Sequence, residues 1–216
     1  MVLIKRFNFG FINVPKNAST AIRSFMINNV VQPEDKYSKS ERFVKKWQNM
    51  DPALAWNSHM DVQFAIDNKI AEPTVNFHGV VRHPLEKLLS LYAHRYRTKE
   101  FKVFSVENFR ERAKDGVIKT KPWQEQLQST FLTYNGKEIG TWWLYDHIDT
   151  HISDFVKQYD IKVIKPLQRE NNSFQQQETK FFINKFYDNK TIAAVEKHYE
   201  KDFELYERVK KQYGKI

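Results

Sequence analysis

A lysine and two hydroxyl residues stand together at 15–21, in the stretch Pro-Lys-Asn-Ala-Ser-Thr-Ala. Residues 7–14 are β-prone and the residues after this stretch predict an amphipathic helix, so it is a strand-to-helix junction. First-turn N–H groups of a helix lack intrahelical acceptors, and the helix dipole adds positive potential. With the charge of Lys16, this junction can bind a phosphate. The alternative is that Ser19 and Thr20 serve only as helix caps.

The glycine pattern of a Walker A loop is absent from this junction. That pattern needs glycines around the loop and a Ser or Thr directly after the lysine, where it holds magnesium. No glycine lies between Gly10 and Gly79, and Asn17 follows Lys16. A nucleotide kinase or another phosphate-transfer enzyme of the P-loop type therefore remains an alternative that the sequence disfavours.

A second cationic turn follows the β-prone segment 74–81. Arg82 comes directly after it, and a proline two residues later suits the first turn of a helix at 85–97. Ser90 lies on that helix, off its apolar stripe. Because ligands gather at the carboxyl ends of parallel strands, we expect Arg82 and Lys16 to emerge at one edge of the sheet, where an arginine fork and a hydroxyl suit a phosphate. The alternative is that Arg82 pairs with a surface carboxylate and Ser90 faces water.

Together the two segments resemble the motifs of the sulfotransferases that use 3′-phosphoadenosine 5′-phosphosulfate (PAPS), specifically the carbohydrate sulfotransferase branch. Segment 15–25 is similar to that family's 5′-phosphosulfate loop. Segment 80–92 is similar to its 3′-phosphate motif, roughly Arg-x-Pro-x-x-Arg-x-x-Ser-x-Tyr. Shorter echoes follow in the family's order at 128–132, 171–173 and 201–206, so the resemblance covers most of the chain.

The resemblance implies a P-loop-like α/β fold that moves a sulfuryl group from PAPS to an acceptor hydroxyl on a carbohydrate, leaving 3′,5′-adenosine bisphosphate and requiring no metal. It implies that Lys16 contacts the 5′-phosphate and the bridging oxygen, and that Arg82 and Ser90 hold the 3′-phosphate. The residues that would cradle the 5′-phosphate are Asn17, Ala18, Ser19, Thr20 and Ala21. Sulfuryl transfer needs in-line positioning and neutralisation of the leaving oxygens, which such a site supplies.

Acceptor activation needs a general base, and the resemblance points to His59, at the start of a helix expected over about 59–69. An imidazole titrates near neutral pH and can accept a hydroxyl proton. The alternative is that His59 caps its own helix, for which Ser58 is the expected cap and Asp61 its capping-box partner. Asp61 and His83 are the substitute bases.

Two departures from the family's pattern bear on these assignments. Many members have glycine where Asn17 and Ala18 stand; asparagine tolerates a left-handed conformation and alanine is small, so the turn remains available. Lys87 stands in place of the second arginine of the 3′ motif, which weakens any bidentate contact there. Luminal animal members also carry a membrane anchor and cysteines, and this chain has no cysteine.

The elements that must position these residues alternate between strands and helices. This alternation predicts an α/β fold with a mostly parallel sheet covered by helices on both faces. Strands are expected at 7–14, 74–81, 139–145 and 161–164, a turn at Asn135-Gly136, and helices at 18–26, 59–69, 85–97, 106–114, 122–132, 148–158, 176–187 and 188–212.

The 216 residues, of which 41% are hydrophobic and 15% aromatic, predict one domain over 1–216 with a sizeable core. Segments 32–58 and 98–125 are polar or irregular excursions and the candidate acceptor walls, and their tryptophans either stack on sugar rings or fill the core. The absence of cysteine excludes a disulfide scaffold, a cysteine nucleophile and thiolate zinc sites.

The charge balance, 35 Lys and Arg against 26 Asp and Glu for a net +9, favours anionic partners or serves solubility alone. An anionic glycan acceptor fits it. A non-enzymatic nucleic-acid-binding protein is the second alternative, but the basic residues are scattered and no binding motif is present, so no nucleic-acid partner is expected. The sequence carries no signal for an oligomeric state.

No apolar stretch approaches the roughly 20 residues of a membrane-spanning helix, and Lys5 and Arg6 break the N-terminal apolar run. We therefore expect a soluble, cytoplasmic protein.

His147 and His151 stand four residues apart, but the glutamate that a zinc-protease motif would place at 148 is an isoleucine. No metal site is expected.

Overall fold

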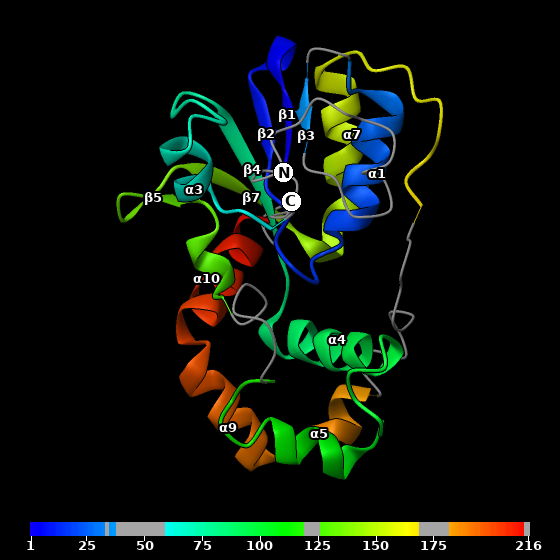
Figure 1. Cartoon of the computed structure of the whole chain (residues 1–216), viewed down its shortest axis with the longest axis vertical. Coiled ribbons are helices and arrows are strands. Elements are labelled where there is room, and N and C mark those ends of the chain that lie inside the picture. Colours follow the sequence, from blue (N-terminus) through cyan, green and yellow to red (C-terminus); the bar gives the residue numbers. More distant parts are fainter. Residues whose placement is uncertain (33–34, 38–58, 119–125, 169–181, 214–216) are drawn as a thin grey trace. The chain divides into compact units, whose positions relative to one another are not determined.

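The computed structural model describes residues 1–32, 35–37, 59–118, 126–168 and 182–213 (Figure 1). Contacts divide the chain into two compact units. Unit 1 comprises Met1–Val80 and Thr130–Gln168, and unit 2 comprises Val81–Ser129 and Arg169–Ile216. Most of the 32–58 excursion, and the three tryptophans of the two excursions, lie outside the described residues.

Unit 1 is built on a five-stranded sheet with the strand order β3-β1-β2-β4-β7. The strands are β1 (Val2–Ile4), β2 (Phe9–Phe11), β3 (Lys36–Tyr37), β4 (Asn76–Val81) and β7 (Gly140–Leu144). Strands β2 and β4 run parallel, with Phe11 opposite His78, whereas β1 runs antiparallel to both β2 and β3. The sheet is therefore mixed: the expected parallel pairing joins β2 and β4, and the β3-β1-β2 side is antiparallel.

The N-terminal β-prone segment is a hairpin, not the single strand predicted at 7–14. Residues Lys5–Phe7 form a 3-10 turn, η1, between β1 and β2. Asn8 closes this turn at a φ of 48°, in the left-handed region that asparagine tolerates. The charged side chains of Lys5 and Arg6 are thereby exposed at the turn, which is why the apolar run breaks there.

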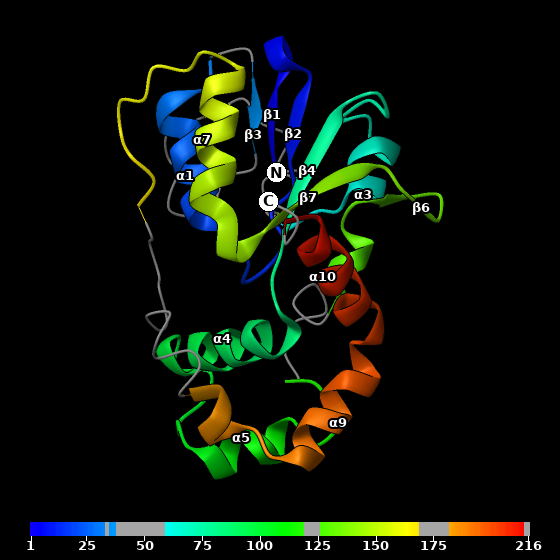
Figure 2. The ribbon, with the colours of Figure 1, turned by 180° about the vertical axis from the view of Figure 1, so that it is seen from behind.

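Helices α1 (Ser19–Asn29) and α7 (Ile148–Gln158) pack side by side on one face of this sheet (Figure 2). The buried cluster between helices and sheet consists mainly of Phe9, Phe11, Ile22, Phe25, Met26, Val80, Trp143, Ile152 and Phe155. The short helix α3 (Val62–Asp67) lies on the other side of the sheet (Figures 1 and 2). Helices thus cover both faces of the sheet, as the sequence predicts.

Helix α3 is shorter than the helix expected over 59–69, because its N-cap is Asp61 and not Ser58. The Asp61 carboxylate accepts a hydrogen bond from the Phe64 N–H at 2.8 Å. This bond satisfies one of the first-turn donors of the helix. His59 therefore precedes the helix and does not cap it.

Unit 2 is helical. Its helices are α4 (Pro84–Arg97), α5 (Val106–Arg112), α9 (Asn189–His198) and α10 (Glu200–Tyr213), and residues 182–186 are also helical. Its core joins Leu88, Leu89 and Tyr92 of α4 to aromatic residues of the other segments. Phe101, Phe109 and Ile118 belong to this core, so the described part of the 98–125 excursion packs into unit 2.

The turn expected at Asn135-Gly136 is confirmed. It joins β5 (Thr133–Tyr134) to β6 (Lys137–Glu138), and both turn residues have positive φ, 48° and 76°. Asparagine followed by glycine suits such a two-residue hairpin turn because both tolerate the left-handed region.

Two expected elements are wrong, and a third is divided in two. Residues 161–164 form no strand: Ile164 is 71% exposed, and its backbone N–H donates to the Asn29 side chain. Of the helix predicted at 122–132, the described residues 126–132 hold only the 3-10 turn η3 (Gln128–Thr130). The helix predicted at 188–212 is two helices, α9 and α10, which meet at the buried Tyr199. In the described ranges, no helix is long and apolar enough to cross a membrane.

Two histidines that pack against aromatic rings, His78 and His151, make the stability of unit 1 depend on pH. His78 stacks on Phe9 and His151 stacks on Trp143, where the His151 Nε2 accepts the Leu144 N–H at 3.0 Å. Burial lowers the pKa of each from 6.5 to about 4. Each ring is therefore neutral in the folded protein at pH 7, whereas the unfolded chain takes up the proton below pH 6.5.

We expect the free energy of unfolding to fall by about 2 kcal/mol for each of these histidines between pH 7 and pH 5. Urea denaturation at the two pH values measures it. The variant His151→Gln keeps an acceptor for Leu144 but does not titrate, so its pH dependence should be smaller by about 2 kcal/mol. The exposed His198→Gln is the matched control and should match the parent protein; an undiminished pH dependence in His151→Gln would contradict the account.

Candidate functional site

The loop between β2 and α1 bends through two left-handed residues. Lys16 has a φ of 66° and Ala18 a φ of 57°. Asn17, the residue whose tolerance for this conformation the sequence suggested, is not one of them. Its side chain is fully buried, and its Nδ2 donates to the carbonyl of Val80 at 2.6 Å. This bond ties the loop to the carboxyl end of β4.

Helix α1 begins without a side-chain cap. Its N-cap residue is Ala18, and no side-chain hydrogen bond caps the helix. The hydroxyl of Ser19 donates instead to the Val14 carbonyl at 2.5 Å, and Thr20 is exposed. The interpretation of Ser19 and Thr20 as simple caps is therefore wrong.

The uncapped first turn gives the loop the character of an anion site. The first N–H donor within α1 that reaches an acceptor of the same helix is that of Ile22, which bonds the Ala18 carbonyl at 3.2 Å. The N–H groups of residues 19–21 precede it and point out of the helix start. Lys16 is half-buried next to them in the sequence. An ammonium, several N–H donors and the helix dipole together favour a phosphate.

His59 lies close to the segment that leads into this loop. Its Nδ1 is 2.8 Å from the carbonyl of Asn13. Burial lowers the pKa of His59 from 6.5 to about 4; the bond to Asn13 opposes this shift, and the positive charges of Arg23 and Lys16 add to it. The ring is therefore neutral at pH 7. With its Nδ1–H donated to a carbonyl, Nε2 carries the lone pair that a general base needs.

The two substitute bases are committed to other contacts. Asp61 caps α3 through the Phe64 N–H. His83 packs edge-on against the rings of Phe203 and Tyr206 within unit 2, at centroid distances of 5.4 and 4.9 Å. These contacts favour His59 among the three candidates.

The second cationic turn belongs to unit 2. Arg82 is only 8% exposed, and its Nε is 3.1 Å from the Glu86 carboxylate, one turn into α4. Arg82 thus does pair with a carboxylate, through one of the five N–H donors of a guanidinium. Ser90 is 5% exposed, so the alternative in which it faces water is wrong.

Lys87, the second basic residue of this motif, is engaged inside unit 2. Its Nζ donates to the Gln126 carbonyl at 3.1 Å and lies 3.8 Å from the Asp202 carboxylate. Burial lowers the pKa of Lys87, and Asp202 opposes that shift. Lys87 therefore forms a buried ion pair with Asp202 within unit 2.

Sequence patterns alone did not single out Gln128 and Asp202. They fall only within segments 128–132 and 201–206, two of the shorter stretches that resemble the family. The missed signal is the position of Asp202 in α10. It precedes Leu205, Tyr206 and Val209 on the buried stripe of that helix, where a carboxylate needs partners.

Unit 1 therefore holds Lys16, the 17–21 loop and His59, and unit 2 holds Arg82 and Ser90. Within the described part of the chain, no group of three or more histidine, aspartate or glutamate side chains could hold a metal ion. His151, one of the two histidines considered for zinc, accepts a backbone N–H through its Nε2.

We expect glycine to fit the loop better than alanine at position 18. An alanine in the left-handed region costs about 1–2 kcal/mol, while glycine adds entropy to the unfolded chain. Ala18→Gly should therefore raise the free energy of unfolding by about 0.5–1 kcal/mol in urea denaturation. The control Ala21→Gly, inside α1, should lower it by about 1 kcal/mol. Equal losses in both variants would show that the left-handed conformation of Ala18 carries no strain.

Comparison with known proteins gives one family. A family model described as the sulfotransferase family matches residues 1–207, which includes the loop, His59, the second turn and most of α10. Neither the curated proteins nor the solved structures give a match.

Proposed function

Because the chain belongs to the sulfotransferase family, we propose that it transfers a sulfuryl group from PAPS to a hydroxyl of a carbohydrate acceptor. The observation that carries the donor assignment is the loop at 15–21. It combines Lys16, an uncapped helix start and two left-handed residues, and Asn17 anchors it to the carboxyl end of β4. Ligands of open α/β sheets bind at such strand ends.

The loop supplies what the leaving group needs. The N–H groups of residues 19–21 bind the oxygens of the 5′-phosphate, and Lys16 faces the oxygen that bridges phosphorus and sulfur. When the acceptor oxygen attacks sulfur, the bond from sulfur to that bridging oxygen breaks and its electron pair stays on the phosphate. Lys16 and the helix start then stabilise the added negative charge.

Arg82 and Ser90 hold the 3′-phosphate in this proposal, as the resemblance implies. Two features of the chain support it. Arg82 stands directly after the last residue of β4, at the carboxyl end of a strand, where ligands of open α/β sheets bind. The contact with Glu86 orients the planar guanidinium, and the fork geometry of arginine matches a phosphate.

His59 accepts the proton of the acceptor hydroxyl at Nε2. In the ligand-free protein its pKa is about 4, in part because Lys16 and Arg23 are positive. A polyanionic donor beside Lys16 offsets these charges and raises the pKa of His59, since a nearby negative charge favours the imidazolium. Donor binding thus makes His59 a stronger base just when it is needed.

The donor site predicts a preference for nucleotides that carry a 3′-phosphate. We expect 3′,5′-adenosine bisphosphate to bind at least about tenfold more tightly than 5′-AMP, a difference of about 1.4 kcal/mol that charge-assisted hydrogen bonds readily supply. Isothermal titration calorimetry measures both dissociation constants. Lys16→Ala should weaken both nucleotides, whereas Arg82→Ala should remove the preference.

Equal affinity for the two nucleotides, or no binding of either, would contradict the donor assignment. Random-sequence DNA is the control ligand. Tight binding of DNA that weakens steeply with salt, without a nucleotide preference, would favour a nucleic-acid-binding protein instead.

The base assignment predicts a loss of turnover without loss of donor binding. His59→Ala should lower kcat by about 10²–10⁴-fold and leave the dissociation constant of 3′,5′-adenosine bisphosphate within about twofold, because the side chain contacts the acceptor and not the donor. Normal turnover in His59→Ala, on an acceptor found by screening glycans with labelled donor, would remove this assignment.

A further inference from the structure

The peptide of Arg82 is held by a side chain from a distant part of unit 2. Gln128 is fully buried, and its carboxamide meets both polar groups of the Arg82 backbone. Its Oε1 accepts the Arg82 N–H at 2.9 Å, and its Nε2 donates to the Arg82 carbonyl at 2.9 Å. The carboxamide thus replaces the pair of bonds that a neighbouring strand would make, at the point where β4 gives way to α4.

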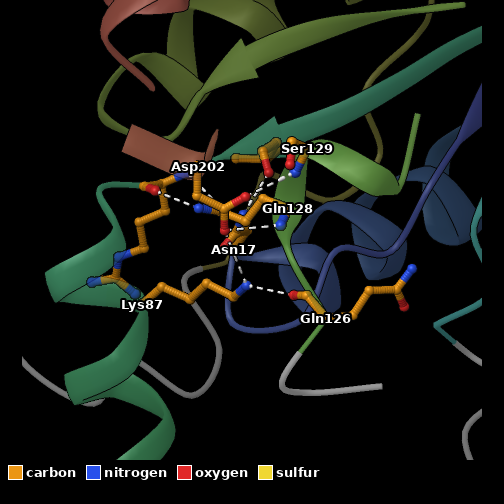
Figure 3. Close-up of polar contacts among 8 residues, drawn as sticks. Asn17, Lys87, Gln126, Gln128, Ser129 and Asp202 are labelled. Atoms are coloured by element: carbon orange, nitrogen blue, oxygen red, sulfur yellow. Dashed lines mark hydrogen bonds and ion pairs between the residues drawn. The ribbon is translucent and has the colours of Figure 1, made fainter. Parts of the chain in front are cut away.

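Gln128 is itself held by α10. Asp202 is fully buried, and its two carboxylate oxygens accept the N–H groups of Gln128 at 2.9 Å and Ser129 at 3.0 Å. Lys87 completes the cluster: its Nζ lies 3.8 Å from Asp202 and donates to the Gln126 carbonyl (Figure 3). Segment 126–129 is therefore fixed by one charge from α10 and one from α4.

The chemistry of this cluster is costly for a purely structural role. Taking a carboxylate and an ammonium out of water carries a desolvation penalty that apolar side chains of similar size avoid. The cluster fixes the position of the Arg82 backbone, because its hydrogen bonds connect Asp202 to Gln128 and Gln128 to Arg82. Binding contacts lose strength when a charged group is displaced by even 1 Å, so a rigid support has a functional use.

We propose that Gln128 and Asp202 are positioning residues for the 3′-phosphate of the donor. They touch no nucleotide themselves; they fix the backbone of Arg82, and through it the guanidinium that binds the 3′-phosphate. This inference rests on the proposed donor site. It makes the preference for 3′-phosphorylated nucleotides depend on residues 46 and 120 positions away from Arg82 in the chain.

The test compares three variants by titration calorimetry with 3′,5′-adenosine bisphosphate and 5′-AMP. Gln128→Met keeps the length of the side chain but removes both bonds to Arg82. Asp202→Asn keeps its shape but removes the charge that holds segment 126–129. Gln126→Met is the matched control, because the Gln126 carbonyl and not its side chain accepts Lys87, and the side chain points away from the cluster (Figure 3). Circular dichroism and thermal melts establish that each variant is folded.

The measured quantity is the ratio of the dissociation constant of 5′-AMP to that of 3′,5′-adenosine bisphosphate. We expect this ratio to fall at least about tenfold in Gln128→Met and Asp202→Asn and to stay within about twofold in Gln126→Met. The affinity for 5′-AMP itself should change little. Should one of the two cluster variants not fold, the other decides by the same ratio.

A structural role alone would lower the melting temperature and leave the ratio unchanged, and that result would overturn the inference while the donor site stands. Failure of the proposed function shows itself separately. In that case the parent protein has no preference for the 3′-phosphate, and the inference falls with it.

Discussion

A buried hydrogen bond from Asn17 to the carbonyl of Val80 fixes the loop on which the candidate site depends. The bond helps to hold Lys16 and Ala18 in the left-handed region, where a residue other than glycine costs about 1–2 kcal/mol. The bond also gives the Val80 carbonyl, near the end of β4, a donor from a loop in place of one from a neighbouring strand. The start of α1 is uncapped because its N-cap residue, Ala18, has no polar side-chain atom that could accept a hydrogen bond.

The segments of Lys16 and Arg82 position their positive charges in different ways. Lys16 stands next in the sequence to first-turn N–H groups that have no acceptor within α1, so the backbone supplies much of the positive potential. The backbone N–H and carbonyl of Arg82 both bond the Gln128 carboxamide. The N–H of Gln128 in turn donates to the Asp202 carboxylate of α10. Strain and buried charge are thus concentrated at the segments that the resemblance assigns to the donor, which is where proteins commonly store them.

Much of this was predictable from the sequence, and the misses have physical reasons. The helices after 84 and after 148 follow from one apolar stripe each, and the Asn135-Gly136 turn follows from residues that tolerate positive φ. The β1–β2 hairpin was missed because three-residue strands carry too few positions for a pattern. Segment 161–164 has the composition of a strand but pairs with none of the described strands, and composition does not encode pairing. Asp202 and Gln128 act through tertiary contacts 74 residues apart, which no local pattern shows.

The central claim is that the start of α1 receives the 5′-phosphate of the donor. Backbone amide resonances of ¹⁵N-labelled protein, followed during titration with 3′,5′-adenosine bisphosphate, report on it directly. The account predicts that the amides of residues 19–21 shift to lower field and saturate together with binding, because each gains a charged acceptor. Saturated binding that leaves these three amide resonances in place would contradict it.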